Sequence, residues 1–211
     1  MEKILLIGAG GHAKSVIDSI RSNREYEIVG IIDKNVMVNK EIIGVPVIGK
    51  DEDLPMYYKK GIKNAFITVG SVGDTAVRQR LYEYAKSIGF QLPNIIDSTA
   101  VACKSNIIGG GALIAKNVIV NVETTIGSMA IINSGAIIEH ECRIGQFVHI
   151  APGATLCGRV CVEDHTHIGA NATILPSVHI GKHVMIGAGS VVLHNLNDRQ
   201  KVAGNPARNI R

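Results

Sequence analysis

An aliphatic residue recurs at every sixth position from Ile108 to Val192, without a single interruption. A small or β-branched residue follows four places after nearly every one of them, as Cys142 follows Ile138. A period of six fits neither a lone helix, with about 3.6 residues per turn, nor a half-buried strand, with a period of about 2. It is typical of a β-helix whose three faces each take one hexad. The pattern therefore predicts a left-handed parallel β-helix in which residues three hexads apart are stacked.

We expect this β-helix to occupy residues 95–211, because weaker hexads can be read back to Ile96. The uninterrupted part corresponds to about five coils, or about 24 Å at the usual spacing between strands. Its aliphatic residues should point into the prism, with glycines, Asn121 and Asn133 at corners that need a positive φ. Beyond the last hexad we expect Lys201–Arg208 to be an irregular polar tail. No inserted loop interrupts the repeat, so a site here must be built from the coils and from neighbouring chains.

Residues 1–94 have a different pattern, which predicts three buried strands alternating with helices. The apolar runs expected to form parallel strands are Lys3–Gly8, Tyr26–Asp33 and Asn64–Gly70. The segments with helical spacing are His12–Arg21, Asp74–Ile88 and a short Asp51–Lys60 interrupted at Pro55. Between them, Gly44–Gly49 is expected to be a loop. This order is that of a Rossmann-like α/β domain of the βαβαβ type.

The helix expected at Asp74–Ile88 has clear signals at both ends. Asp74 is a good N-cap and Gly89 a good C-terminal stop. Its apolar face is expected to comprise Val77, Leu81, Tyr84 and Ile88.

Composition narrows the classes of function. Apolar residues make up 46% of the chain but are evenly spread, and no run approaches the roughly 18 residues of a membrane span. The net charge of +4 is mild and lacks the basic stripe that nucleic-acid binding needs. The chain begins with an apolar strand rather than a secretory signal, and its four cysteines form no CxxC pair. We therefore expect a cytoplasmic protein with reduced thiols, no membrane span and no nucleic-acid partner.

The strongest candidate for chemistry is the run Ile138–Cys142, in which His140 stands between two glutamates. Acyl transfer to an amine or hydroxyl needs a base that works near neutral pH, and histidine fits. Gly158 is stacked on His140, which leaves space beside the imidazole and a backbone N–H for an oxyanion. Glu141 can orient the imidazole only if the chain turns a corner there. The alternatives are an exposed surface histidine and, for Glu141, a stacked ion pair with Arg159.

Other histidines raise the question of a metal site. His149 and His167 are stacked in successive coils, and His165, His179 and His183 are near them in the sequence. Zinc needs three or four converging ligands, whereas the stacked pair offers at most two unless a neighbouring chain supplies a third. We therefore expect no metal, and a surface or ligand-contacting role for these histidines.

The run Gly8–Lys14 follows a strand and opens a helix, and Gly8, Gly10 and Ala13 fit the pattern G-x-G-x-x-A. Amides at a helix N-terminus bind phosphate oxygens, and Asp33 at the end of the next strand can bind a ribose or sugar hydroxyl. This pattern alone favours an NAD-dependent dehydrogenase. Fewer than about 100 residues, however, hold only half of a dinucleotide-binding fold, so a mononucleotide-sized ligand fits better. A purely structural glycine turn is the alternative.

Together these features resemble a known family. The repeat resembles the hexapeptide-repeat acyltransferases, and Val202–Arg208 resembles their usual C-terminal segment. The added run Gly8–Lys14 is more specific. With it, the chain resembles the bacterial sugar O- and N-acyltransferases related to sialic acid O-acetyltransferase and to the UDP-4-amino-sugar N-acetyltransferase of bacillosamine synthesis. The similarity extends over essentially the whole chain, and Ile138–Cys142 with His149 matches the active-site stretch of that family.

This resemblance implies roles for individual residues. His140 would be the general base, Glu141 the residue that raises its basicity, and Gly158 the residue that faces the thioester carbonyl. The implied contacts to acetyl-CoA are His149, Ala170 and Ala188. The implied contacts to a nucleotide sugar are Gly10, Gly11, His12, Asp33, Lys34 and Gly70. The resemblance also implies a homotrimer in which acetyl-CoA lies between neighbouring β-helices.

We therefore expect an acetyl-CoA-dependent acetyltransferase that acts on the amino group of a nucleotide-linked amino sugar, a precursor of cell-surface glycans. O-Acetylation of sialic acid or a related sugar hydroxyl would use the same base. A β-helical metalloenzyme and a non-catalytic scaffold are the alternatives from other classes. The first would contain stoichiometric zinc, and the second would not bind acetyl-CoA.

Overall fold

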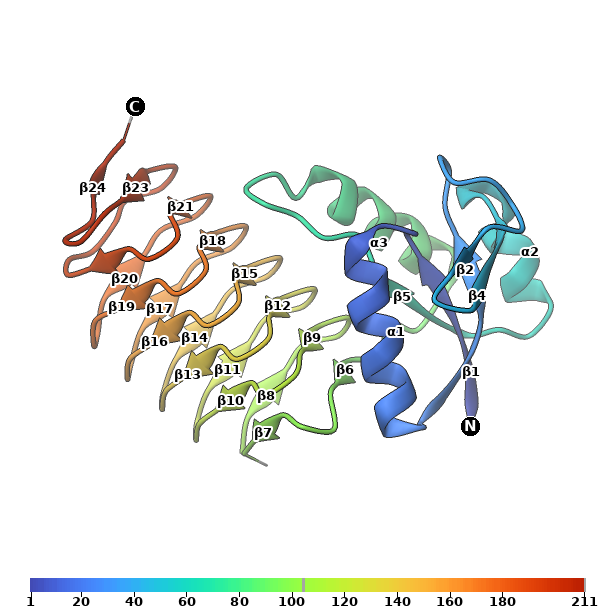
Figure 1. The fold of residues 1–211 in the computed structure, drawn as a ribbon, viewed down its shortest axis with the longest axis horizontal. Helices are drawn as coiled ribbons and strands as arrows, with labels where there is room; N and C mark the ends of the chain where they lie inside the picture. Colours follow the sequence, from blue (N-terminus) through green and yellow to red (C-terminus); the bar gives the residue numbers. More distant parts are fainter. Residues whose placement is uncertain (104, 211) are drawn as a thin grey trace.

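A computed structural model describes residues 1–103 and 105–210 as an α/β part followed by a long stack of coils (Figure 1). The strands of the first part are β1 (Glu2–Ile7), β2 (Tyr26–Ile32), β3 (Glu41–Ile42), β4 (Val45–Gly49) and β5 (Asn64–Ile67). Its helices are α1 (Gly11–Asn23), η1 (Asp51–Asp53, a 3₁₀ turn), α2 (Leu54–Lys59) and α3 (Ala76–Ile88). No helix within the described residues is long and apolar enough to span a membrane.

The strands of the first part form one sheet in the order β3-β4-β2-β1-β5, parallel except for β3. Successive residues of β1 face opposite sides of this sheet. Ile4 and Leu6 belong to the apolar cluster that contains α1, whereas Leu5 and Ile7 belong to the cluster that contains α2 and α3. Helices therefore cover both faces, which is why these strands are continuous apolar runs.

The segment expected to be a loop at Gly44–Gly49 is largely strand β4, so this prediction was wrong. Its Val45 and Val47 are buried at 4% and 0% exposure, and β4 runs parallel to β2. The fit depends on Gly30 of β2, where a Cβ would lie 2.6 Å from Ile48. Close packing against a neighbouring strand, which no local turn signal reveals, therefore extends the sheet.

Helix α3 differs from its prediction at the N-terminus and along its buried face. It begins at Ala76, and the carboxylate of Asp74 accepts the Ala76 N–H at 2.9 Å from the turn before the helix. Val77 is 46% exposed, and Arg78 takes its place on the buried face at 2%. The helix ends as predicted at Gly89, which has a φ of 107°. The short helix α2 is not interrupted by its proline, which lies in the first turn where no N–H is needed.

The second part is the predicted β-helix, whose short strands form three faces, with the strands of each face parallel except for β24. Face 1 consists of β7 (Val101–Ala102), β10 (Ile119–Val120), β13 (Ile137–Ile138), β16 (Thr155–Leu156), β19 (Thr173–Ile174) and β22 (Val191–Val192). Face 2 consists of β8 (Ile107–Ile108), β11 (Thr125–Ile126), β14 (Arg143–Ile144), β17 (Cys161–Val162) and β20 (His179–Ile180). Face 3 consists of β6 (Ile95–Ile96), β9 (Leu113–Ile114), β12 (Ile131–Ile132), β15 (His149–Ile150), β18 (His167–Ile168), β21 (Met185–Ile186), β23 (Lys201–Ala203) and β24 (Arg208–Asn209). The expected architecture, a Rossmann-like α/β domain followed by a left-handed parallel β-helix, is confirmed.

The hexad positions have the expected roles, with one correction at the corners. From Ile108 to Val192 the aliphatic residue is the second residue of its strand, and it is buried in each of these hexads except that of Ile108. Positive φ is not found at Asn121 or Asn133 but two residues later, at Glu123 and Gly135. Glycine at the first corner position instead allows successive coils to approach closely. At Gly127, for example, a Cβ would lie 2.6 Å from the backbone nitrogen of the next coil.

The C-terminal tail was also predicted wrongly, because Lys201–Arg208 is not irregular. Strand β23 continues face 3 beside β21, and β24 turns back to pair with it in antiparallel orientation. Val202 is 2% exposed and belongs to the same apolar cluster as the coils below it. The tail therefore covers the open end of the β-helix.

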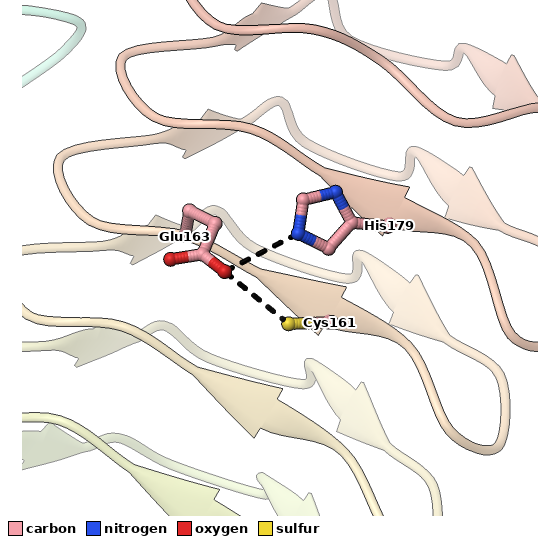
Figure 2. Close-up of side chains that lie close together, drawn as sticks. All are labelled: Cys161, Glu163 and His179. Atoms are coloured by element: carbon pink, nitrogen blue, oxygen red, sulfur yellow. Dashed lines mark hydrogen bonds and ion pairs between the residues drawn. The ribbon is translucent and has the colours of Figure 1, made fainter.

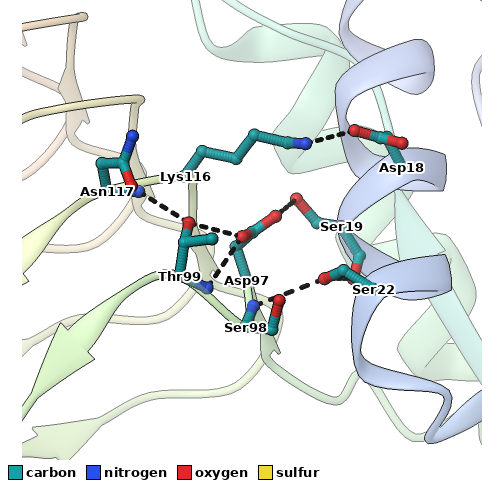
Figure 3. Close-up of polar contacts among 8 residues, drawn as sticks. All are labelled: Asp18, Ser19, Ser22, Asp97, Ser98, Thr99, Lys116 and Asn117. Atoms are coloured by element: carbon teal, nitrogen blue, oxygen red, sulfur yellow. Dashed lines mark hydrogen bonds and ion pairs between the residues drawn. The ribbon is translucent and has the colours of Figure 1, made fainter.

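Two groups of contacts join the α/β part to the β-helix. The first connects α1 to the start of the coils (Figure 3), where Ser19 Oγ donates to Asp97 Oδ2 at 2.6 Å and Lys116 pairs with Asp18. Asp97 is only 2% exposed. Burial alone would raise the pKa of Asp97, but hydrogen bonds from Ser19 and Thr99 outweigh it and leave that pKa lowered. An ionised, fully partnered carboxylate therefore fixes α1 on the first coil.

The second group of contacts centres on Arg78 of α3. Its guanidinium donates to Ser71 Oγ at 3.3 Å and to the Met129 carbonyl, and it lies 5.8 Å from the ring centroid of Phe147. Burial lowers the pKa of Arg78 to about 10, so it remains a cation at neutral pH. Because this buried cation has no carboxylate partner among residues 1–103 and 105–210, it depends on these contacts, which tie α3 to the corner between faces 2 and 3.

Candidate active site

One cavity of about 430 Å³ opens at the carboxyl ends of β1, β2 and β5 in the α/β part. It is lined by all six residues expected to contact a nucleotide sugar, which are Gly10, Gly11, His12, Asp33, Lys34 and Gly70. This is the edge of a parallel sheet at which α/β proteins bind their ligands. The fold therefore brings the six residues together in one cavity, although up to sixty positions separate them in the sequence.

The glycine run forms the floor of this cavity. Strand β1 ends at Ile7, Gly8 turns the chain with a φ of 113°, and α1 begins at Gly11. A Cβ at Gly10 or Gly11 would meet nothing within 4 Å. The protein's own packing therefore does not require glycine at these two positions, and the space beside the N-terminus of α1 is open to a ligand. Such a helix end favours an anion such as phosphate.

His12 contributes a buried imidazole to the wall of the cavity. Burial, with smaller contributions from Arg78 and His149, lowers the pKa of His12 to about 4, so the ring is neutral at physiological pH. Its Nε2 is buried and has no hydrogen-bond partner within the described part of the chain. A buried polar atom without a partner is costly, and a bound ligand would remove this cost.

Asp33 also lines the cavity, but its carboxylate is hydrogen-bonded to the protein's own backbone. It accepts the backbone N–H groups of Ala9 at 2.7 Å, Asn35 at 2.8 Å and Val36 at 3.0 Å. Three of its roughly four acceptor positions are therefore used to hold the loops after β1 and β2 together. The sequence suggested a hydroxyl ligand for Asp33 and did not reveal this structural function.

His140 lies on the opposite side of the molecule, at the corner between faces 1 and 2. Its side chain is 47% exposed, and its Nδ1 lies 2.9 Å from Oε2 of Glu141. The contact exists because Glu141 has a φ of 60°, which turns adjacent side chains toward each other. The corner condition stated for this pair is thus met. Nδ1 carries the hydrogen when it donates to a carboxylate, which leaves Nε2 as the free acceptor of a proton.

Glu141 has a second partner, since Arg159 of the next coil donates to the same Oε2 at 3.0 Å. The hydrogen bond from His140, followed by that from Arg159, lowers the pKa of Glu141. The two interpretations of Glu141 are therefore compatible, because one carboxylate orients the imidazole and also pairs with the stacked arginine.

Gly158 is stacked against the imidazole as the spacing predicted. A Cβ at Gly158 would lie 2.6 Å from both Cε1 and Nε2 of His140, so any side chain here would displace the ring. The Gly158 carbonyl accepts the Ser177 N–H at 2.9 Å, whereas its own N–H has no partner among the described residues. Glycine thus leaves both the imidazole edge and one backbone donor accessible.

His149 differs from His140 in every respect that matters for chemistry. It projects from β15 on face 3 toward the α/β part, where its Nδ1 donates to the Ser71 carbonyl at 2.7 Å. Its Nε2 lies 3.3 Å from Nδ2 of Asn133, and its ring meets that of His167 at 4.9 Å. Burial lowers the pKa of His149 to about 4. Both nitrogens are therefore already engaged within the chain.

Ala170 and Ala188 are stacked at the corner that follows face 3. The Ala170 carbonyl accepts the Gly189 N–H at 2.8 Å, and both alanines are at least partly exposed. Neither alanine N–H donates to another group in the described ranges. Two free amides in successive coils are suitable donors for a polar chain lying along this edge.

The cavity and His140 are not brought together within one chain. The α/β part contacts face 3 and its two flanking corners, through β6, Met129, Phe147 and Lys116. His140 occupies the remaining corner of the triangular prism, and none of the cavity-lining residues belongs to the β-helix. A site that uses both must therefore combine two copies of the chain.

Several residues of the two regions escaped the sequence analysis. Asn35 and Arg80 also line the cavity, and Arg80 forms an exposed ion pair with Asp51 at 3.3 Å. Ser71 and Arg78, which connect His149 to α3, carry no motif.

Two family models match the chain. The model described as the PglD N-terminal domain matches residues 3–85, and the model described as bacterial transferase hexapeptide (six repeats) matches residues 162–194. The comparison with curated proteins gives no match.

Solved structures resemble the chain over its whole length. PerB from Caulobacter crescentus, in complex with CoA and GDP-perosamine, is 36% identical with a TM-score of 0.93, over 100% of this chain and 98% of PerB. The acetyltransferase domain of PglB from Neisseria gonorrhoeae, in complex with acetyl coenzyme A, is 31% identical with a TM-score of 0.92, over 99% of both chains. WeeI from Acinetobacter baumannii is 26% identical with a TM-score of 0.83, over 100% of both chains.

Proposed function

Because the chain belongs to the hexapeptide-repeat sugar acyltransferases with a PglD-type N-terminal domain, we propose that it N-acetylates a nucleotide-linked amino sugar with acetyl-CoA. The observation that carries the proposal is the corner at His140, where an exposed imidazole has its Nδ1 held by Glu141 and its Nε2 free beside Gly158. PerB, which this chain resembles over its full length, has been solved with CoA and a nucleotide-linked sugar.

In the proposed reaction, Nε2 of His140 takes a proton from the sugar amino group while the amino nitrogen attacks the thioester carbonyl. The carbonyl oxygen becomes an oxyanion, which the free N–H of Gly158 stabilises. Collapse of this intermediate forms the amide and breaks the C–S bond, and the imidazolium returns its proton to the departing sulfur. Glu141 orients the ring and stabilises the charge that develops on it, while no covalent enzyme intermediate forms.

The nucleotide sugar would occupy the cavity of the α/β part. Open space at Gly10 and Gly11 and the N-terminus of α1 suit its phosphates, and Nε2 of His12 would gain the partner that it lacks. Lys34 offers a cation to the same ligand, while Gly70 leaves the space beside His12 unobstructed. Asp33 would act mainly by fixing these loops, with one acceptor position left for a hydroxyl.

Acetyl-CoA would lie along the β-helix, with the free amides of Ala170 and Ala188 as donors to its pantetheine chain. Both nitrogens of His149 already have partners in the chain. Its proposed contribution is therefore van der Waals contact between its ring and acetyl-CoA, with the ring held in place by Ser71, rather than a hydrogen bond to the ligand. The proposed reaction needs no metal ion.

We further propose a homotrimer in which the cavity of one chain faces His140 of its neighbour. The opposed positions of the cavity and His140 in a single chain support this arrangement, because a closed ring of three prisms brings such edges together. The proposed domains are residues 1–94 and 95–211. Four free cysteines suit a reducing compartment, which supports a cytoplasmic location.

A panel of UDP-, GDP- and CMP-linked 4-amino sugars, with release of free CoA thiol as the readout, tests the function. The expected result is turnover with at least one amino sugar and none with its deaminated analogue. Turnover only with a sugar hydroxyl would replace N-acetylation by O-acetylation, and no release of thiol with any acceptor would refute the proposal.

Mixing two inactive variants tests the shared site. His140→Ala keeps an intact cavity, and Gly11→Trp keeps an intact base but fills the cavity. After mild dissociation and reassembly of the mixture, activity should return, because some sites then pair an intact cavity with an intact His140. Reassembled oligomers without activity would show that each chain must supply both parts itself.

A further inference from the structure

Face 2 of the β-helix carries a cluster of side chains that the proposed acetyl transfer does not use. The first residue of each strand on this face points outward, and in β17 and β20 these residues are Cys161 and His179. They are direct neighbours in the parallel register, so the thiol and the imidazole lie in adjacent coils. Glu163, two residues after Cys161, turns back over the same patch (Figure 2). One thiol, one imidazole and one carboxylate therefore converge at the surface.

Two of the three distances within this cluster are close to those of a metal site. Glu163 Oε1 lies 3.2 Å from His179 Nε2 and 3.7 Å from Cys161 Sγ, and the three potential ligand atoms all lie within 4.8 Å of one another. Zinc binds nitrogen and oxygen at about 2.0–2.2 Å and thiolate sulfur at about 2.3 Å. In a tetrahedral site these bond lengths separate neighbouring ligand atoms by about 3.3–3.7 Å. The cluster therefore needs little rearrangement to hold an ion.

The backbone that carries these ligands is fixed by the coils. The N–H groups of Cys161 and Glu163 donate to carbonyls of the next coil at 3.0 and 2.9 Å, and that of His179 donates to Asn195 Oδ1 at 2.8 Å. Glu163 and His179 have side chains 37% and 50% exposed, so an ion can reach them from solvent. A rigid and accessible set of ligands loses little conformational entropy on binding.

The charges around the cluster have opposing effects on the binding of a cation. Glu163 supplies a carboxylate, whereas Arg143 lies in register with Cys161 in the preceding coil and repels a cation. Arg143 also favours the thiolate, although burial and Glu163 together raise the pKa of Cys161. Binding of a metal ion must therefore displace the thiol proton to solvent.

We propose that Cys161, Glu163 and His179 form a three-ligand site for one Zn²⁺ ion per chain, with water in the fourth position. Softer thiolate and imidazole donors with one carboxylate select zinc over magnesium or calcium, which prefer oxygen ligands only. The site lies outside the cavity of the α/β part, and its Cys161 lines a shallow pocket together with Glu141, Arg143 and Arg159.

Titration of the full-length, reduced and metal-free protein with Co²⁺ tests the proposal. Cobalt should give a thiolate-to-metal charge-transfer band and the intense visible bands of a four-coordinate ion, saturating at one equivalent and abolished by Zn²⁺. Cys161→Ser should lose the charge-transfer band, while Cys157→Ser, which removes another partly exposed thiol outside the cluster, should keep it. Glu163→Gln and His179→Gln should each weaken cobalt binding by at least about tenfold.

Two results would overturn this site. One is a charge-transfer band that persists in Cys161→Ser. The other is cobalt bound without such a band, as expected if the stacked rings of His165 and His183 were the ligands. Circular dichroism of each variant checks the fold, and because all three positions are on the surface, any one correctly folded variant of the three decides the matter.

Discussion

His140 and His149 are histidines of the same β-helix, but their surroundings are opposite in exposure and in hydrogen bonding. His140 stands at an exposed corner with one nitrogen held by Glu141 and the other free. His149, nine positions later, is covered by the α/β part, with both nitrogens engaged and its pKa lowered to about 4 by burial. The comparison teaches that coverage by the α/β part accompanies two engaged ring nitrogens at His149, whereas the uncovered corner leaves one nitrogen of His140 without a partner among the described residues.

The largest expected effect is on turnover. His140→Ala should lower kcat by roughly 10²–10⁴-fold, because it removes the proposed general base. His149→Ala should affect kcat far less and mainly raise KM for acetyl-CoA. Steady-state assays with a reactive amino-sugar acceptor measure both values, with size-exclusion chromatography as the control for assembly. Equal losses of kcat in the two variants would remove the functional distinction between the two regions.

Acid should act on the covered region first. The pKa of His149 is about 4 when folded and near 6.5 when unfolded, so the unfolded chain binds the extra proton between these pH values. This histidine therefore contributes its full stabilisation above about pH 6.5 and loses it as pH falls toward 4, by up to roughly 3 kcal/mol. His12 should act in the same direction. Urea unfolding at several pH values measures the slope, and His149→Gln should flatten it; an unchanged slope in this variant would contradict the assignment.

Arg78 provides a test of what holds the covered region in place. Arg78→Met should lower the free energy of unfolding by about 1–3 kcal/mol, because the buried Met129 carbonyl loses its donor. Arg80→Met is the matched control two residues away, since its side chain is 52% exposed and its ion pair with Asp51 is worth about 1 kcal/mol or less. Chemical denaturation compares the two, and an equal or larger loss for Arg80→Met would contradict the importance of this contact.

The smallest effect is expected at the open corner beside His140. Glu141→Gln should lower kcat by about fivefold or less, because the lost carboxylate charge is exposed and screened by water. Glu139→Gln is the matched control, since Glu139 accepts from Asn121 at 3.0 Å rather than contacting the imidazole. Initial-rate measurements at saturating acetyl-CoA distinguish the two. A loss as large as that of His140→Ala would mean that Glu141 itself takes part in proton transfer.

The predictability of the two parts differs for a physical reason. In the β-helix each residue meets its neighbours at a fixed sequence distance, so the stacking of Gly158 on His140 could be read from spacing alone. The positive φ at Glu141, which brings its carboxylate to the imidazole, could not be read in this way, because the alternation of side chains along a strand does not predict the backbone conformation of a corner residue. The corners at Asn121 and Asn133 were misassigned for the same reason.

In the α/β part the glycine run and the ends of the strands predicted the residues of the cavity, since parallel strands bring their carboxyl ends to one edge. Strand β4 and the burial of Arg78 could not be predicted, because both depend on surfaces distant in the sequence. The position of Asp33 at the cavity was predicted, but its main structural function was not. Its hydrogen bonds from three backbone N–H groups depend on loop geometry, which the sequence pattern does not give.

The tight stacking of the coils at Gly127 and its equivalents limits how the length of this protein can vary. Insertion of a single residue in a coil would turn inward side chains outward, whereas a whole extra coil would keep every contact in phase. An added coil between Met129 and His140 would still move the base by about 4.8 Å relative to the cavity that Arg78 anchors. A coil added beyond Val192 would leave that spacing and the stacking of Ala188 on Ala170 intact, so the C-terminal end is where length is free to change.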